Sequence, residues 1–184
     1  IYFALNDVDP ALLARAANRM KKSDKGGTTA DGDILRRRWL LVDLDAVRPA
    51  GISATAAERA ATIERGRAID LHLHDRGWPD PIVCDSGNGT HLYYRIDLPA
   101  DDGGLVARCL AALSASFSDG VVNVDKSVHN PARITKLCGT LVCKGDSTPD
   151  RPHRMAAITS APESPQVVPV ALLEELAGPP ATVT

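Results

Sequence analysis

Apolar and polar residues alternate in several short runs of the chain, which is the pattern of β-strands with one buried face. The clearest run is segment 37–45. Leu40, Val42 and Leu44 occupy one face of it, and Leu41, Asp43 and Asp45 share the other. Similar short runs predict further strands at 2–5, 82–85, 90–97, 121–125 and 153–159.

A second pattern, apolar residues three and four positions apart, predicts helices. These helices are expected near 10–20, 56–75, 106–117 and 172–176. Asp9 followed by Pro10, and the capping box Thr55-x-x-Glu58, mark the starts of the first two. Irregular, glycine-containing segments at 21–33 and 126–151 separate the periodic runs. Because helices are mixed with strands and hairpins, the predicted fold class is α+β (mixed α/β) with a largely antiparallel sheet.

The composition is that of one globular domain with a short tail. The chain has 184 residues, of which 44% are hydrophobic, so it is able to bury a core. We expect the main domain over 1–160, and a C-terminal helix with a tail or linker over 161–184. No apolar run approaches the ~20 residues of a membrane helix and no signal peptide is visible, so a cytoplasmic protein is expected. The sequence begins at Ile1 inside a strand-like run, which favours a piece of a longer protein.

The four cysteines, at 84, 109, 138 and 143, form no CxxC pair. Cys138 and Cys143 are separated by four residues, with His129 and His153 nearby in sequence, so a zinc site is one alternative. The favoured interpretation is that all four are free cysteines in a reducing cytoplasm, used as small apolar residues.

Asp43 and Asp45 are the sharpest chemical feature, because two carboxylates on one strand face repel each other unless a cation lies between them. Mg²⁺ and Mn²⁺ prefer carboxylate oxygen. Two such ions about 4 Å apart activate a 3′-hydroxyl and stabilise a leaving pyrophosphate. Asp125 ends the run VVNVD and completes a possible trio of ligands. Taken singly, a DxD pair or a strand-end Asp is also typical of an exposed carboxylate with no role.

The segment 86–89, with the sequence SGNG, predicts a tight hairpin turn. Its glycines would let backbone N–H groups approach a phosphate closely. In the returning strand, alternation places His91, Tyr93 and Arg95 on one face. A histidine and an arginine on one face suit a triphosphate, and Tyr93 would shape the pocket for its sugar. The alternative is an ordinary Asn-Gly hairpin with a hydrogen-bonded histidine.

Because the net charge is −2, any positive charge for nucleic-acid binding must be local. The run 126–144 supplies Arg133, Lys136 and Lys144, which would neutralise phosphates of a triphosphate or a template. The run 36–38, three arginines, either binds DNA backbone or lies on a solvated edge.

The order of these motifs resembles the archaeo-eukaryotic primase superfamily, and most of all its phage- and plasmid-type bifunctional primase-polymerase (prim-pol) domains. The motifs, in order, are LVDLD, SGNGTHLYY, VNVDKSVHNPARITKLCGT and KGDSTPDRPHR. The stretches YFALNDVDPALLARAANRM and ILRRRWLLVDLDAVRPAGISAT carry the resemblance toward the N-terminus. It covers about residues 1–160, and the ordered set is more specific than any one motif.

The resemblance implies a role for each motif. It implies that Asp43, Asp45 and Asp125 are metal ligands, and that His91 joins them as a catalytic residue contacting the phosphates of the incoming nucleotide. The candidate nucleotide-binding residues are Ser86, Asn88, Gly89, His91, Arg133 and Lys136. Many members carry serine at the position of Gly89, so this chain lacks that hydroxyl. The implied fold is a two-part α/β cleft, one part of which carries an RRM-like sheet.

The leading hypothesis is that segment 1–160 is a DNA-directed primase-polymerase, a nucleotidyltransferase that uses Mg²⁺ or Mn²⁺ at a two-metal site. It would make a primer on single-stranded DNA, extend one, or do both, with NTP or dNTP as substrate. A fused or coupled helicase is an expected partner in phage, plasmid or bacterial replication, although the chain has no GxxxxGK[ST] loop. No membrane partner is expected. The alternatives are a non-catalytic DNA-binding replication-initiator module and a metal-dependent nuclease.

Overall fold

The structure is a computed structural model that describes residues 1–17, 19, 22 and 27–179. The end of the predicted helix 10–20, part of the predicted loop 21–33 and the last five residues of the predicted tail lie outside the described residues.

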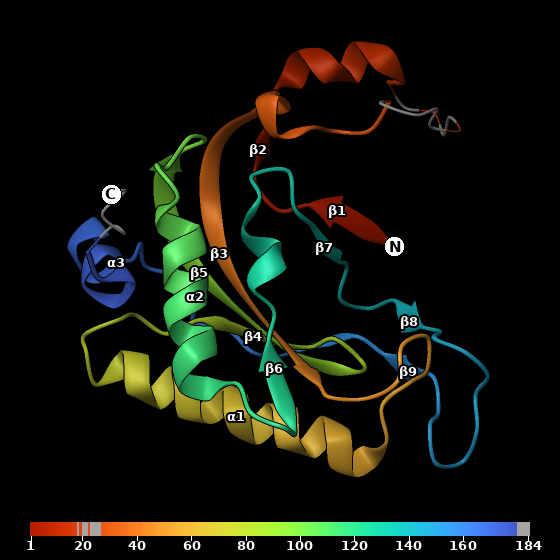
Figure 1. Cartoon of the computed structure of the whole chain (residues 1–184). Helices are drawn as coiled ribbons and strands as arrows, with labels where there is room; N and C mark the ends of the chain where they lie inside the picture. The colour runs from red at the N-terminus through yellow and green to blue at the C-terminus, as the bar shows by residue number, and fades with distance from the viewer. Residues whose placement is uncertain (18, 20–21, 23–26, 180–184) are drawn as a thin grey trace, which may run out of the picture.

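A central sheet forms the middle of the protein (Figure 1). Its strands are β2 (Asp7–Val8), β3 (Ile34–Ala46), β4 (Ile82–Asp85), β5 (Gly89–Pro99), β6 (Val122–Val124) and β10 (Ala157–Ser160). The strand order is β10-β4-β5-β3-β2, with β6 paired to the far end of β3, and every pairing is antiparallel. The fold class is therefore α+β with a largely antiparallel sheet, as predicted.

Two long helices connect these strands, α1 (Ala56–His74) between β3 and β4 and α2 (Leu105–Phe117) between β5 and β6. The resulting order β-α-β-β-α-β, with the paired strands β4-β5-β3-β6, is that of an RRM-like sheet. Alternation along β3 accounts for the two faces of this sheet. Leu40, Val42 and Leu44 are fully buried on the helix side, whereas Asp43 and Asp45 point to the opposite side.

The local sequence explains where α1 begins and how closely it packs on the sheet. The Thr55 hydroxyl accepts a hydrogen bond from the Glu58 N–H, and the Glu58 carboxylate accepts one from the Thr55 N–H, so the predicted capping box is present. Gly66 allows the helix to approach the sheet, because a Cβ there would lie 3.0 Å from Thr90 and 3.4 Å from Leu44. The helix is thereby held directly behind the strand ends that carry Asp43 and Asp45.

A third helix, α3 (Val170–Ala177), packs on α2. The segment that precedes it runs beside β5, where the Val168 N–H donates to the Arg95 carbonyl at 2.8 Å. Val168 and Leu173 are buried, and the Cys109 thiol donates to the Leu173 carbonyl at 3.2 Å. None of the helices in the described ranges is long and apolar enough to cross a membrane.

The face of the sheet away from the helices is approached by a long connection that we call the strap, residues 126–145. It contains the 3-10 helix η3 (Lys126–His129), β7 (Ile134–Lys136) and β8 (Leu141–Val142). β7 pairs with β1 (Tyr2–Ala4) in a two-stranded ribbon, and β8 pairs with β9 (Arg154–Met155). In Figure 1, β1 and β7 lie beside the middle of β3, and β8 and β9 lie nearer its carboxyl end.

Two predicted elements differ from those observed, and the segment 126–151, predicted to be irregular, contains η3, β7 and β8. The predicted α-helix near 10–20 is a 3-10 helix, η1 (Pro10–Arg15), capped by the Asp9 carboxylate as expected, and none of its residues is buried. Without a buried face, the short segment lacks the packing that stabilises an α-helix. The predicted strand 153–159 is two strands, β9 and β10, because the chain leaves β8 and joins β4 at the buried Ala156.

The prediction that all four cysteines are free is wrong for two of them. Cys84 on β4 and Cys138, two residues after β7, form a disulfide. Cys109 is free and buried, and Cys143 is free and exposed. The bond ties the strap to the central sheet across a sequence separation of 54 residues.

The three arginines of the run 36–38 each form an ion pair with an aspartate. Arg36 pairs with Asp97, Arg37 with Asp102 at 3.4 Å, and Arg38 with Asp7 at 2.6 Å as well as with Asp97. These charges are thus balanced within the protein.

Candidate active site

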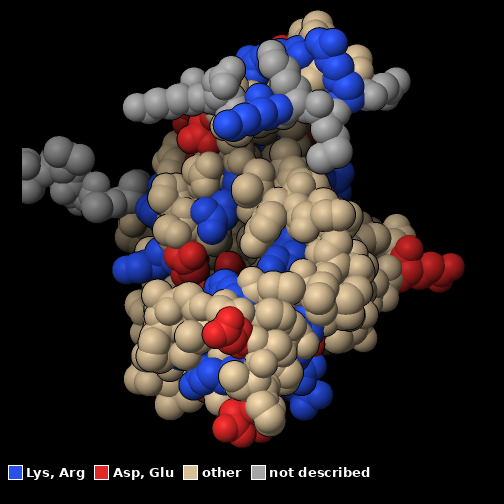
Figure 2. Space-filling model, turned by 90° about the vertical axis from the view of Figure 1, so that its right-hand side faces the viewer, with Lys and Arg blue, Asp and Glu red and all other residues tan. Residues whose placement is uncertain are grey.

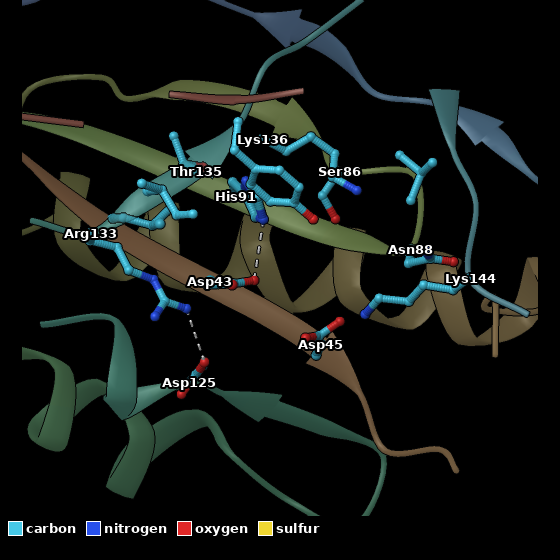
Figure 3. Close-up of a pocket in the computed structure, with 14 residues that line it drawn as sticks. Asp43, Asp45, Ser86, Asn88, His91, Asp125, Arg133, Thr135, Lys136 and Lys144 are labelled. Atoms are coloured by element: carbon cyan, nitrogen blue, oxygen red, sulfur yellow. Dashed lines mark ion pairs between the residues drawn. The ribbon is translucent and has the colours of Figure 1, made fainter. Parts of the chain in front are cut away.

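One cavity of about 240 Å³ brings together the carboxyl-terminal part of β3, the β4–β5 hairpin and the strap (Figure 3). Eight of the nine predicted site residues line it: Asp43, Asp45, Ser86, Asn88, His91, Asp125, Arg133 and Lys136. Lys144, which belongs to the predicted basic run, lines it as well. In the space-filling view of Figure 2, acidic and basic side chains are intermixed on this face of the protein.

Asp43 and His91 lie opposite each other in the ladder between β3 and β5. Their side chains face the same side, with the His91 Nε2 atom 3.3 Å from Asp43 Oδ1. Burial of the Asp43 carboxyl raises its pKa. The charge and hydrogen bond of His91, together with Arg133 and Lys144, outweigh burial and hold that pKa below its usual range. Asp43 is therefore kept anionic in the cavity.

His91 is held from its other side by a buried hydrogen-bonded chain. The His91 Nδ1 atom lies 2.8 Å from the Tyr93 hydroxyl, which lies 2.8 Å from the Thr135 hydroxyl on β7. Burial raises the pKa of Tyr93 to about 12, so the phenol keeps its proton. Tyr93 and Thr135 fix the orientation of the imidazole, and they join the sheet to the strap.

Asp45 is paired with Arg48, which sequence reasoning missed. The Arg48 guanidinium lies 3.3 Å from Asp45 Oδ1 and also donates to the carbonyls of Ala46 and Ile52. Only 6% of its side chain is exposed, so a full charge is buried beside the carboxylate. Arg48 stands in a turn with no periodic pattern, so nothing in the sequence distinguished it from a surface arginine.

Asp125 reaches the cavity because β6 ends next to β3. Its N–H donates to the Asp43 carbonyl at 2.9 Å, which brings the two residues side by side. The Asp125 carboxylate caps η3 by accepting from the Ser127 N–H at 2.8 Å, and it lies 4.0 Å from the Arg133 guanidinium. Asp125 therefore links the last strand of the RRM-like unit to the strap.

The three carboxylates suit a divalent cation in their chemistry. Their oxygens are the ligands that Mg²⁺ and Mn²⁺ prefer. Each lies beside a basic side chain: His91 for Asp43, Arg48 for Asp45 and Arg133 for Asp125. Within the described residues, no three His, Cys, Asp or Glu side chains are gathered closely enough to hold a metal ion. Binding an ion would require these pairs to rearrange.

Backbone and side-chain groups of the β4–β5 hairpin are already hydrogen-bonded, within the turn or to neighbouring backbone. The Gly87 N–H donates to the Asp85 carboxylate, and the Gly89 N–H donates to the Ser86 hydroxyl. Asn88 is buried, and its amide oxygen accepts from the Ala54 N–H at 2.7 Å. The glycine amides predicted to approach a phosphate are thus engaged within the turn, while the Ser86 and Asn88 side chains line the cavity.

Gly89 is required by a close approach of two strands. It pairs with Asp45 at the end of the β3–β5 ladder, and a Cβ at this position would lie 2.1 Å from the Leu44 carbonyl oxygen. Gly89 is the one predicted site residue that does not line the cavity. It instead permits β5 to lie closely against the strand that bears Asp43 and Asp45.

The strap supplies the lysine and arginine side chains that line the cavity. Arg133 precedes β7, Lys136 is its last residue, and Lys144 follows β8. The Lys144 backbone is held by the Ser53 hydroxyl, which donates to its carbonyl at 3.1 Å. Three positive side chains therefore face three carboxylates across one cavity (Figure 3).

Comparison with known proteins identifies the fold. No family model matches the chain, and no curated protein sequence matches it. Among solved structures, the chain is similar to the archaeo-eukaryotic primase (AEP) domain of the cyanophage S-2L primase-polymerase (PrimPol). The TM-score is 0.51 and the sequence identity is 16%. The match covers 83% of this chain and 66% of that one, just under two thirds of its length. The chain thus has an AEP-like fold, as the motif order implied.

Proposed function

We propose that this chain catalyses divalent-metal-dependent nucleotidyl transfer on a single-stranded DNA template, as a primase-polymerase domain. The observation that carries the proposal is the cavity in which Asp43, Asp45 and Asp125 face Arg133 and Lys136 around His91. A nucleoside triphosphate brings a polyanion that needs cations, and its transfer needs anionic ligands for a metal. The AEP-like fold supports the same conclusion.

In the proposed reaction, Asp43, Asp45 and Asp125 hold Mg²⁺ or Mn²⁺. The metal, when bound, lowers the pKa of the attacking hydroxyl and offsets the charge that develops on the leaving pyrophosphate. Arg133, Lys136 and His91 hold the triphosphate so that its α-phosphorus faces the primer 3′-hydroxyl. The hydroxyl oxygen forms the new bond to the α-phosphorus, the α–β bridging bond breaks, and the hydroxyl proton passes to solvent.

The proposed substrates are NTP or dNTP and a single-stranded DNA template, with or without a primer. A helicase, fused or coupled, is the proposed partner, in the cytoplasm of a cell that carries the phage, plasmid or bacterial gene. The exposed cations of the strap would then contact template or nucleotide phosphates.

One observation favours a second candidate, a DNA-binding module without catalysis. Asp43, Asp45 and Asp125 are each already paired with His91, Arg48 or Arg133, as if their charges were only structural. In that function the chain would bind DNA without metal. A nuclease shares the carboxylates but makes no use of triphosphate-binding cations.

The deciding experiment measures nucleotide incorporation on single-stranded DNA, with and without a primer, in Mg²⁺ and in Mn²⁺. Wild type runs beside Asp43→Ala/Asp45→Ala and beside Asp80→Ala, a control that removes a carboxylate 69% exposed and outside the cavity. We expect nucleotide-dependent product growth in wild type and Asp80→Ala, and none in the double variant.

Each of the other outcomes favours one of the alternative functions. If the wild type fails to incorporate but binds DNA as tightly as the double variant, the binding module is correct. If the DNA shortens without added nucleotide, the nuclease is correct. Circular dichroism of the double variant verifies that a loss of activity is not a loss of fold.

A further inference from the structure

The β1–β7 ribbon has two faces of different character. Directly paired residues of antiparallel strands share a face, and the register pairs Tyr2 with Lys136 and Ala4 with Ile134. Tyr2, Lys136 and Ile134 all line the cavity with the carboxylates. The neighbouring pair, Phe3 and Thr135, alternates to the face toward the sheet, where the Thr135 hydroxyl contacts Tyr93 and also lines the cavity.

The face formed by Tyr2, Ile134 and Lys136 carries two exposed apolar side chains beside a cation. Tyr2 is 58% exposed and Ile134 is 53% exposed, whereas Thr135, between Ile134 and Lys136, is buried. The Lys136 ammonium lies 5.3 Å from the centroid of the Tyr2 ring, within the range of a cation–π contact. An exposed aromatic ring, an aliphatic side chain and a cation therefore lie together at the edge of the catalytic cavity.

We propose that this face, formed by Tyr2, Ile134 and Lys136, is a nucleobase-binding subsite in which a base stacks on the Tyr2 ring. The inference rests on the proposed function, since it assigns a second part of the nucleic-acid substrate to the same cavity. The base belongs either to the incoming nucleotide or to the template strand, and both present the same flat apolar surface.

The chemistry of the cavity supports this assignment. Its cations and carboxylates match the phosphates and the metal, but none of them matches a base. Single-strand binding sites in proteins combine aromatic side chains, on which bases stack, with nearby positive charge that follows the backbone. Lys136 joins the two, because it contacts the ring and lines the phosphate side of the same cavity. Since every base has a flat face, such a subsite accepts all four bases.

The test compares three variants by direct binding, without catalysis. Tyr2→Ala removes the ring, Tyr2→Phe keeps it, and Phe3→Ala alters the same strand on its other face. Calorimetry measures binding of a dNTP and of inorganic tripolyphosphate, and fluorescence anisotropy measures binding of single-stranded DNA. Loss of a stacked base is expected to weaken one of the two base-containing ligands about 5- to 150-fold in Tyr2→Ala. Tyr2→Phe and Phe3→Ala are expected to remain within about 2-fold of wild type on that ligand, because both keep the Tyr2-position ring.

Tripolyphosphate separates stacking from a general change in the cavity, since it has no base. Its binding is expected to be the same in wild type and Tyr2→Ala. Weaker dNTP binding assigns the subsite to the incoming nucleotide, and weaker DNA binding assigns it to the template. Unchanged binding of both, or an equal loss for tripolyphosphate, would overturn the subsite. Incorporation by the wild-type preparation reports on the proposed function separately, so a failed subsite is not confused with a failed enzyme.

Discussion

The sheet side and the strap side of the cavity are built in opposite ways. On the sheet side, Asp43 and His91 are opposite partners in the long β3–β5 ladder, with a buried hydrophobic layer behind them. On the strap side, Arg133 and Lys136 stand on or next to a three-residue strand, which forms a two-stranded sheet with β1. The anionic half of the site therefore stands on strands that belong to the core, whereas the cationic half is carried by a segment with only short strand pairings.

This difference separates stability from binding. Short strands with few buried contacts open at a lower free energy than the strands of a core. Changes on the sheet side should therefore affect the fold, and changes on the strap side should affect ligand binding. The connections that cross between the halves include the Cys84–Cys138 disulfide, the Tyr93–Thr135 hydrogen bond and the Asp125–Arg133 ion pair.

Breaking the disulfide tests whether the strap depends on its tether. Cys138→Ser removes a cross-link that closes a long loop, which is expected to cost about 4 kcal/mol of unfolding free energy. Denaturant titration measures that cost, with the exposed Cys143→Ser as the control. Thiol titration of the denatured, unreduced wild type should find two thiols, those of Cys109 and Cys143. Four thiols would show that the halves are not tethered in solution.

Gly89→Ala tests the close approach on the sheet side. The new methyl group would meet the Leu44 carbonyl, so β3 and β5 must separate. The expected loss is about 3 kcal/mol, or about 6–12 °C in Tm. Gly120→Ala is the matched control, since nothing lies within 4 Å of its Cβ position. Equal Tm values for the two variants would contradict the packing argument.

Arg133→Ala tests the strap side. Removing a charged hydrogen-bond donor to a triphosphate is expected to weaken nucleotide binding by about 10- to 100-fold. Because Arg133 is on the strap, Tm should change little. Calorimetry and a melting curve measure the two quantities. Arg36→Ala, which removes an arginine paired with Asp97 outside the cavity, should bind nucleotide as wild type does. A similar loss of nucleotide binding in both variants would mean that the effect comes from net charge alone.

Tyr93→Phe tests the connection through His91. It deletes the hydroxyl between His91 and Thr135, and the unpaired buried groups are expected to cost about 1–2 kcal/mol. Tyr94→Phe is the control, since its hydroxyl bonds Asp70 on the helix side at 3.2 Å. Both variants should lose stability, but kcat should fall only in Tyr93→Phe. Equal kcat values would mean that Tyr93 is structural only.

The same division explains what the sequence predicted. Alternation in segment 37–45 predicted which side Asp43 and Asp45 face, because a strand with one buried face imposes a two-residue period. The 126–151 segment has no period, so its position followed only from the motif order and from the structure. The Arg48 pair and the Cys84–Cys138 bond join residues distant in sequence or lying in a turn, for which local pattern carries no signal.

The packing of α3 has a practical consequence for how the protein is expressed. A version that stops at residue 160 keeps every strand, yet it loses Val168 and Leu173, which are buried in the intact protein. The side of α2 that carries Cys109 and Leu113 would then face water, and exposed apolar patches of this kind favour aggregation. A soluble fragment for the experiments above should therefore extend beyond Ala177.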